Sequence, residues 1–479
     1  MHRRNFLKAG AVLMGGLGAG DRLAAAVADG RGGNDRPDVV FIACEDLQTS
    51  LRCYGNPVVK TPNLDSLASR GLRFDNAHCQ FSVCNPSRAS VMSGRYPASV
   101  GVLGNATDWR EPLRNIATIP EHFRAHGYET LRCGKIFHGG NAGRVFDDKG
   151  RWDRVIPQNE GIPSSKHKRR PLRALYENMS KEERAKEYTT RAWEWGPSGL
   201  DDLEMPDGRV AEQAVRQLSR KHDKPLFLAL GFHSPHLVLT APDKYFDMYS
   251  LGEIRLPENP ENDLDDVSRY SLRNHKQFTD EKRREAILAY YACCSYVDAG
   301  VGRVLKALED SGGIDNTIVV FWGDHGFHLG EHFLWQKHTL FEESTRVPLI
   351  MMAPGVTRAG TVCTRPVELI DLYPTLCELC GLPMPEGLES ISMVPLLKDA
   401  QRQWKKGAFT TLGPTPGNSV RTERWRYTEW GGPDKAELYD HESDPHEFTN
   451  LAKVPRYAAT VEELGEVLRG GWRAALPEE

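Results

Sequence analysis

The sequence predicts an α/β fold with a large, doubly wound, mostly parallel sheet flanked by helices. A smaller C-terminal α+β part carrying an antiparallel sheet is expected to follow. Three observations support this prediction. Four apolar runs of strand length end in polar residues, helix-like segments lie between them, and strand-like segments with turn residues gather after residue 400. With 479 residues, the chain has room for one large domain and a smaller one.

The four apolar runs span residues 39–44, 129–133, 226–230 and 317–322. Near-continuous apolar runs of this length are typical of parallel strands that are buried on both faces. Ligands of a doubly wound sheet bind beyond the carboxyl ends of its strands, so the residues that follow these runs are expected to meet in one crevice. They are Glu45 and Asp46, Lys135 and His138, His233 and His236, and Asp324 and His325.

Helices are expected at residues 63–69 and 281–308, where they would cover the sheet. A further helix is expected to start at Cys84, because Pro86 suits the first turn of a helix that continues to Val91. The free N–H groups of a helix start stabilise an anion, and Arg88, one turn on, would direct a guanidinium to the same place. The alternative is that Cys84 is a buried structural cysteine.

Four of the residues that follow the predicted strands form a candidate metal site. Glu45, Asp46 and Asp324 offer carboxylate oxygens, and His325 adds one imidazole. Hard oxygen ligands of this kind suit calcium, or magnesium as the alternative, better than a zinc site built on thiolates. Without a metal, the carboxylates would instead cap the turns and helices that follow the strands.

The ten cysteines do not show the spacing of a disulfide framework, and no pairing follows from the sequence. Cys377 and Cys380 form a C-x-x-C, but it lies in a helix-like run from Leu372 and has no second pair. Packing is therefore expected there in place of zinc or redox chemistry. Cys293 and Cys294 are expected in or near the core.

The N-terminus predicts export. Arg3 and Arg4 precede a short apolar, glycine-rich stretch and an Ala-x-Ala site that ends at Ala28, as in a twin-arginine signal peptide. A frayed helix is the alternative. The predicted organisation is a signal at 1–28, a catalytic domain at 29–399 and a C-terminal subdomain at 400–479, in a periplasmic or secreted protein without stable membrane insertion.

The charge distribution argues against nucleic acid as a partner, since the formal net charge is −4 and no basic global field results. The irregular segment 141–206 holds one basic run, residues 166–170. This run is interpreted either as a solvated loop or as a surface that meets an anionic sugar chain. After residue 400, strands are expected at 408–412 and 419–430.

The run Cys84-Asn85-Pro86-Ser87-Arg88, followed by Ser93-Gly94-Arg95, resembles the signature of the formylglycine-dependent sulfatases of the alkaline phosphatase superfamily. The likeness extends from residue 37 to about 451. It implies that Cys84 is oxidised to formylglycine by a formylglycine-generating enzyme. The hydrated aldehyde would attack sulfur with one hydroxyl and expel sulfate with the other.

The resemblance also implies roles for the strand-end residues. Glu45, Asp46, Asp324 and His325 would hold calcium or magnesium near the oxidised side chain of Cys84. Glu45 departs from the family pattern, which has aspartate there, so either direct ligation or an outer position remains open for it.

Four further residues would act on the sulfate ester. Lys135 and Lys337 would neutralise sulfate oxygens, and His138 would deprotonate the diol for the elimination step. His233 would be the general acid that protonates the departing alcohol.

The sequence assigns the roles of three further histidines less directly. His236, in the pattern Gly231-Phe232-His233-Ser234-Pro235-His236, is a candidate for substrate binding. His328 is also interpreted as substrate-facing, as is His332, with packing as an equal alternative for both.

The function implied by the resemblance is hydrolysis of sulfate from a sulfated carbohydrate, a glycosaminoglycan or another sulfated polysaccharide. Residues 53–55, 134–138 and 419–422 look most like iduronate-2-sulfatases within the family. One alternative is a phosphodiesterase or phosphonate monoester hydrolase of the same superfamily. The other, of a different class, is a non-catalytic carbohydrate-binding relative.

Overall fold

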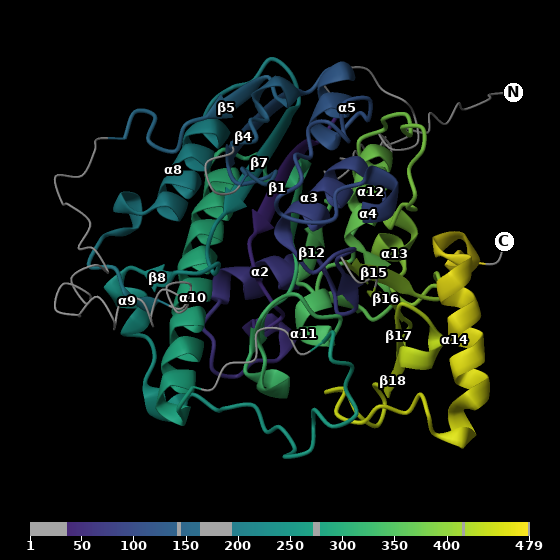
Figure 1. Ribbon diagram of the computed structural model, residues 1–479. Helices are drawn as coiled ribbons and strands as arrows, with labels where there is room; N and C mark the ends of the chain where they lie inside the picture. Colours follow the sequence, from purple (N-terminus) through teal and green to yellow (C-terminus); the bar gives the residue numbers. More distant parts are fainter. Residues whose placement is uncertain (1–35, 141–144, 163–193, 272–277, 414–416, 478–479) are drawn as a thin grey trace, which may run out of the picture.

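The computed structural model describes residues 36–140, 145–162, 194–271, 278–413 and 417–477. Among these residues, eight strands form the central sheet (Figure 1), and β12 alone runs opposite to the others. The α/β, mostly parallel fold class is confirmed. In spatial order the strands are β13 (Thr361–Cys363), β2 (Leu72–Phe74), β12 (Leu349–Met352), β9 (Thr317–Gly323), β1 (Asp38–Cys44), β7 (Leu226–Phe232), β4 (Glu129–Gly134) and β5 (Arg154–Ile156).

The four strands predicted from apolar runs are neighbours in the middle of this sheet, in the order β9, β1, β7 and β4. All are parallel, and their ends are level: Cys44 pairs with Gly323 on one side and with Phe232 on the other, while Gly134 pairs with Gly231. The polar residues that follow the strands are therefore brought to one edge, as expected for this type of sheet.

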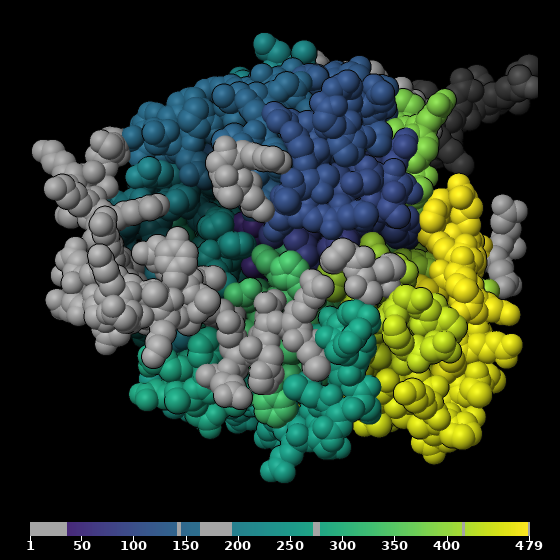
Figure 2. Space-filling model, viewed as in Figure 1, coloured from purple at the N-terminus to yellow at the C-terminus, as the bar shows by residue number. Residues whose placement is uncertain are grey.

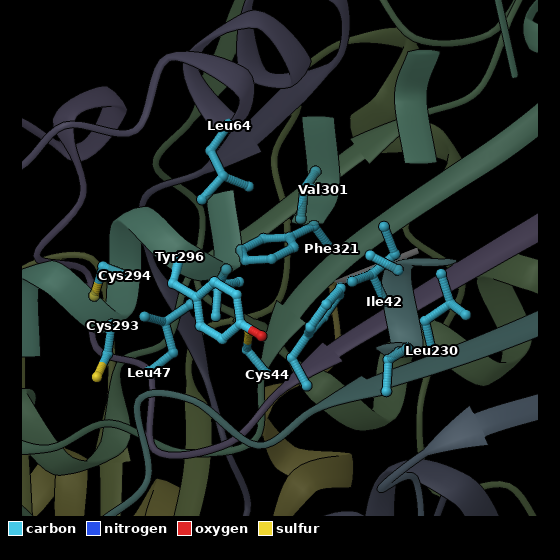
Figure 3. Packing of buried hydrophobic residues seen from close by; sticks show 14 of the residues in the cluster. Ile42, Cys44, Leu47, Leu64, Leu230, Cys293, Cys294, Tyr296, Val301 and Phe321 are labelled. Carbon is cyan, nitrogen blue, oxygen red and sulfur yellow. The ribbon is translucent and has the colours of Figure 1, made fainter. Parts of the chain in front are cut away.

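Helices cover both faces of the sheet (Figure 1), and the period of two in β1 divides its side chains between them. Val40, Ile42 and Cys44 face the core shared with α2 (Pro62–Arg70), α8 (Pro206–Leu218) and α10 (Asp280–Asp310). Figure 3 shows part of this core, with Ile42, Leu230 and Phe321 from three adjacent strands. The opposite core joins Val39, Phe41 and Ala43 to α3 (Cys84–Ser93), α5 (Ile119–Ala125), α12 (Leu372–Leu379) and α13 (Val394–Lys398).

Two glycines let β4 and β7 end close together. A Cβ added at Gly134 would lie 2.0 Å from the main-chain oxygen of Gly231, and one added at Gly231 would lie 2.0 Å from that of Lys135. Gly134 also has a φ of +81°, which L-residues with side chains rarely adopt. Side chains are thus excluded where the two strand ends meet.

The C-terminal region contains the predicted antiparallel sheet, a meander of β15 (Ala408–Leu412), β16 (Gly417–Arg421), β17 (Trp425–Trp430) and β18 (Ala436–Asp440). The expected single stretch at 419–430 is divided into two strands by a turn, so that part of the prediction was too coarse. The helix α14 (Ala458–Gly470) covers this sheet with its own small core (Figure 1).

A buried charge network attaches β17 to the large sheet region. Arg426 is 1% exposed and forms ion pairs with Glu342, in α11 (Glu342–Thr345), and with Glu447. Arg421 reaches the same Glu342 carboxylate at 3.1 Å. His441 Nε2 lies 2.9 Å from Glu447 Oε1, so each carboxylate in the network has a cationic or donor partner.

The remaining strands and α-helices of the described residues are short. They are β3 (Ala77–His78), β6 (Trp195–Pro197), β8 (Leu239–Ala241), β10 (His328–Leu329), β11 (Trp335–Gln336), β14 (Val367–Glu368), α4 (Pro97–Val100) and α9 (Asp243–Phe246).

All ten cysteines lie in the described residues and are free thiols. Cys377 in α12 and Cys380 directly after it are buried in the core, and Cys293 and Cys294 are buried in α10, as predicted. The predicted signal at 1–28 and the basic run at 166–170 lie outside the described residues. Within the described ranges, every helix is too short or too polar to cross a bilayer. The domain boundaries stay predictions.

Candidate active site

The candidate site lies at the carboxyl edge of the central strands, where α3 begins. Figure 2 shows a hollow near the centre of this face, where purple atoms from the N-terminal part of the described chain are visible between blue, teal and green segments. Cys84, Glu45, Asp46, Asp324 and His325 are each 1% exposed or less. The strand-end residues therefore form a deep site beneath a more open rim.

Cys84 is the first residue of α3, as the sequence predicted, and its thiol faces charged side chains. The Sγ atom lies 3.3 Å from Lys337 Nζ, 3.3 Å from His325 Nε2 and 3.8 Å from Asp46 Oδ1. Burial raises the pKa of the thiol, but the ammonium groups of Lys337 and Lys135 outweigh burial and lower that pKa to about 7. The nine other cysteines all have raised pKa values, so Cys84 has the most acidic thiol.

Asp46 and Asp324 hold each other in place. The Asp46 amide donates to Asp324 Oδ1 at 2.9 Å, and the hydroxyl of Tyr290 donates to the main-chain oxygen of Asp46 at 2.7 Å. Asp46 has a φ of 56°, a left-handed conformation that aspartate tolerates better than most residues. Burial opposes ionisation, but nearby cations keep the pKa of both carboxyls below the usual range, so both are charged.

The donor set fits a divalent cation. The ionised carboxylates gathered here suit calcium or magnesium, and the imidazoles of His236 and His325 lie beside them. The ligand atoms within each of two overlapping groups lie within 4.8 Å of one another. The groups are Glu45, Asp46, Cys84 and His236, and Cys84, Asp324 and His325.

Arg88 is completely buried under this cluster. Its Nε donates to Asp324 Oδ2 at 2.7 Å, and Nη1 donates to the main-chain oxygens of Lys135 and Ile136 at 2.7 and 3.0 Å. Burial opposes its charge, but Asp324 raises the pKa of the guanidinium above its ordinary value. Nη2 has no hydrogen-bond partner among the described residues, which leaves one buried donor for an anionic ligand.

Glu45 connects three candidate functional side chains. Its Oε2 lies 2.7 Å from His233 Nδ1, its Oε1 forms an ion pair with Lys135, and His236 Nε2 is 3.7 Å from Oε1. Burial opposes ionisation of Glu45, but Lys135 and the histidines hold its pKa well below the usual range. The longer glutamate thus touches the predicted acid and the predicted sulfate-binding lysine as well as the metal group.

The loop that carries His233 and His236 is fixed by a residue that sequence analysis missed. Asp207, near the start of α8, accepts hydrogen bonds from the amides of His233 and Ser234, both at 2.8 Å. Burial lowers the pKa of His236, but Asp46 and other neighbours raise it to about 9. Asp207 has no local motif, because its role depends on a loop 26 residues away.

Lys337 completes the surroundings of Cys84. Its Nζ donates to Asp46 Oδ1 at 2.6 Å as well as to Cys84 Sγ. Although burial disfavours the charged form, Asp46 raises the pKa of Lys337 above its ordinary value, so the ammonium remains charged. A fixed positive charge therefore lies beside the thiol.

Three further predicted histidines remain, His138, His328 and His332. His138 is in the loop after β4, three residues beyond Lys135, and its main-chain oxygen accepts from the Trp109 indole at 2.8 Å. His328 has no exposed surface, its Nε2 lies 2.8 Å from Thr339 Oγ1, and burial lowers its pKa to about 3. His332 is also fully buried and lies 3.1 Å from Asp263, so packing is the better interpretation for both His328 and His332.

A pocket of about 730 Å³ adjoins the site and contains Lys135 and His233 in its wall. It lies beyond the ends of β4, β5 and β7, beside the start of α8. Its size is in the range of small-ligand sites, so a group larger than sulfate has room next to His233.

The family model that covers most of the chain and two of the most similar curated proteins are all described as sulfatases. Residues 37–382 match a family model described as sulfatase, and residues 330–471 match one described as N-sulphoglucosamine sulphohydrolase, C-terminal. A sulfatase of Formosa agariphila is 33% identical, covering 91% of this chain and 86% of its own length. Iduronate 2-sulfatase of Mus musculus is 30% identical, covering 88% and 89%.

Solved structures agree in fold. A structure described as a 2-O GAG sulfatase matches with a TM-score of 0.70 and 25% identity, covering 91% of both chains. The phosphonate monoester hydrolase of Agrobacterium radiobacter matches with a TM-score of 0.75 and 23% identity, covering 92% of this chain and 96% of its own. At that identity the second likeness concerns the fold alone.

Proposed function

Because the chain belongs to the sulfatase family, and is therefore a sulfuric ester hydrolase, we propose that it removes sulfate from a sulfated carbohydrate through a formylglycine derived from Cys84. The substrate class is a glycosaminoglycan or another sulfated polysaccharide. Relatives with carbohydrate substrates in their names support this class, among them iduronate 2-sulfatase and an ulvan-active sulfatase of Formosa agariphila.

One observation carries the proposal: the Cys84 side chain lies between Lys337 Nζ and His325 Nε2, at 3.3 Å from each, at the start of a helix. The thiol occupies the place that the oxygen-bearing group would take. Formylglycine, as its hydrate, supplies one hydroxyl that attacks sulfur and a second whose deprotonation releases sulfate. The amides at the helix start and Lys337 stabilise the negative charge of the sulfate there.

Asp46, Asp324 and His325 would hold calcium or magnesium together with Glu45, which would either ligate the cation directly or support the site from an outer position. When bound, the cation polarises the sulfate as a Lewis acid. Arg88 fixes the ionised Asp324 through the 2.7 Å bond from its Nε. This buried pair keeps one carboxylate charged and oriented toward the cluster.

His233 is the proposed general acid. His233 Nδ1–H donates to the ionised Glu45 at 2.7 Å, so in the imidazolium form the second proton lies on Nε2, which faces away from Glu45 and can donate to the departing oxygen. The side chain is 54% exposed, at the rim next to the 730 Å³ pocket, so a sugar oxygen can reach it. Lys135 and His236 would bind sulfate oxygens, and His138 would deprotonate the hydrate.

The test is hydrolysis of defined sulfated saccharides by protein purified from a host that forms formylglycine, followed by assay of inorganic sulfate. Sulfate release that depends on Cys84 supports the proposal. Release of the alcohol from a phosphonate monoester or a phosphate diester, with no sulfate release from any saccharide, would support a hydrolase like that of Agrobacterium radiobacter instead. Binding of a saccharide without turnover would indicate the non-catalytic alternative.

The remaining expectations complete this proposal. The twin-arginine signal at 1–28 would deliver the protein to the periplasm or the outside of the cell. A formylglycine-generating enzyme would act on Cys84 during maturation. Residues 29–399 would form the catalytic domain, and 400–479 the C-terminal subdomain.

A further inference from the structure

The pocket beside the site is larger than one sulfate group needs. It measures about 730 Å³ and is bounded by the ends of β4, β5 and β7 and by the first turn of α8. The ionisable side chains that line it are Arg132, Lys135, Asp148, Arg209 and His233. Since sites of this size hold small organic ligands, the question is what the pocket would bind.

The pocket is continuous with the proposed acid. Lys135 and His233 line it, and both also contact Glu45 inside the active site. The oxygen protonated by His233 belongs to the sugar from which sulfate departs. That sugar and its substituents therefore extend toward this pocket.

Two of the positively charged side chains that line the pocket, Arg132 and Lys135, form ion pairs with carboxylates of the protein. Arg132 is paired with Asp148 through two nitrogens, Nε at 2.8 Å among them, and its Nη1 donates to Gly134 O at 2.9 Å. Lys135 is paired with Glu45. Both charges are thus compensated within the protein.

Arg209 is different. Arg209 is a half-buried residue of the pocket wall, and its Nε donates to the main-chain oxygen of Leu203 at 2.8 Å, which helps to position the guanidinium. Among the described residues, no carboxylate forms an ion pair with Arg209. Within the described part of the chain, the Nη donors therefore remain available, and Arg209 is the one positive charge of the pocket wall that no described carboxylate compensates.

We propose that Arg209 binds a second anionic group, a carboxylate or a further sulfate ester, on the sugar whose sulfate is removed or on its neighbour. This inference rests on the proposed carbohydrate sulfatase function. A guanidinium binds planar or tetrahedral oxyanions with paired N–H donors, and one already fixed through Nε loses little freedom on binding. Arg209 is thus a specificity residue that favours substrates with two negative charges.

The experiment compares kcat and KM for matched substrates. One pair is a 2-O-sulfated uronic acid disaccharide and its carboxyl-reduced form; a second pair is a disulfated glucosamine and its monosulfated form. For Arg209→Ala, KM for the dianionic member of the recognised pair should rise about ten- to hundredfold, as for loss of a charged hydrogen bond. KM for the other member and kcat for both should stay unchanged.

Two variants separate recognition from folding. Arg209→Lys keeps the charge and should recover part of the lost affinity, whereas Arg209→Gln should not. Arg220→Ala, which removes an exposed charge just beyond α8, is the matched control and should behave as wild type. Equal KM increases on both members of each pair for Arg209→Ala, or no increase at all, would overturn the proposal.

Binding can also be measured without turnover. Calorimetry with the Cys84→Ala protein and the same saccharides tests whether Arg209 discriminates between the charged and neutral members. If the wild type releases no sulfate but Arg209-dependent discrimination persists, the proposed function fails and the anion site stands. If sulfate is released and discrimination is absent, the function stands and the anion site fails.

Discussion

His233 Nδ1 lies 2.7 Å from Glu45 Oε2, so the buried carboxylate orients the imidazole at the rim of the site. Glu45 stands where the family pattern has aspartate, and its longer side chain also pairs with Lys135. One carboxylate thus links the candidate metal group, the proposed acid and the proposed sulfate-binding lysine. Since Nδ1–H faces Glu45, the proton that His233 would donate is the one on Nε2 of the imidazolium form.

For His233→Ala, we expect activity on a carbohydrate sulfate to fall roughly a hundredfold or more, and activity on an activated aryl sulfate much less. The reason is that a sugar alkoxide needs a proton in order to leave, whereas a nitrophenolate does not. Steady-state kinetics on both substrates checks this. Lys135→Ala is the comparison and should weaken both, because the sulfate is common to them; equal losses for His233→Ala would refute the acid role.

Cys84→Ala should retain the fold and lose turnover, because a methyl group offers no nucleophile. Mass spectrometry of the peptide with residue 84 should show formylglycine in active enzyme. Cys84→Ser should be nearly inactive in a host that modifies only cysteine. Finding only unmodified cysteine in fully active protein would contradict this prediction.

A chelator should abolish activity, and calcium or magnesium should restore it. Asp324→Asn should weaken metal binding, since it removes a carboxylate charge from the cluster that also holds Arg88. Elemental analysis of the purified protein measures the bound cation directly, with the exposed Asp310→Asn as control. Full activity of metal-free protein would rule out the metal assignment.

Arg426→Met should destabilise the protein by about 3–5 kcal/mol, the cost of removing one partner from a buried ion-pair network. Glu342 and Glu447 would each lose a contact that compensates their charge. Urea unfolding gives the free energy. Lys306→Ala removes one half of an exposed helix pair and should change it little. A loss as small as that of the control would mean that other partners compensate the two carboxylates.

Stability should also depend on pH through Glu437. Burial raises its pKa to about 7 from an ordinary 4.5, against hydrogen bonds from Ser268 N and Trp430 Nε1. The folded state therefore favours the protonated form, and this contribution is present below about pH 4.5 and is lost as pH rises through 7. Glu437→Gln should flatten the decline in unfolding free energy between these values, whereas Glu466→Gln on exposed α14 should not.

The central strands were predictable because each is buried on both faces and so has a near-continuous apolar sequence, as in β1 and β9. The outer strands β2, β5 and β13 were missed, since three residues carry no readable period. The turn that separates β16 from β17 was missed as well, because strand-like residues continue on both sides of it.

For the candidate site as well, some residues could be predicted from the sequence and others could not. Residues directly after the central strands were found, because parallel strand ends share an edge. Tyr290, Asp207 and Arg209 come from helices, and their contacts with Asp46, His233 and the pocket depend on tertiary packing that leaves no local pattern. His328 could not be decided from sequence, because only its burial separates packing from substrate contact.

The close approach of Gly134 and Gly231 has a mechanical consequence for catalysis. Lys135 follows Gly134 directly, and His233 follows Gly231 by two residues. The close approach of the ends of β4 and β7 therefore sets the separation between the main-chain positions of these two residues. A methyl group at either glycine would clash with main-chain atoms of the facing strand end and push the two strand ends apart. It would displace Lys135 and His233 together, so the alignment of the proposed sulfate-binding lysine with the proposed proton donor is a property of the backbone.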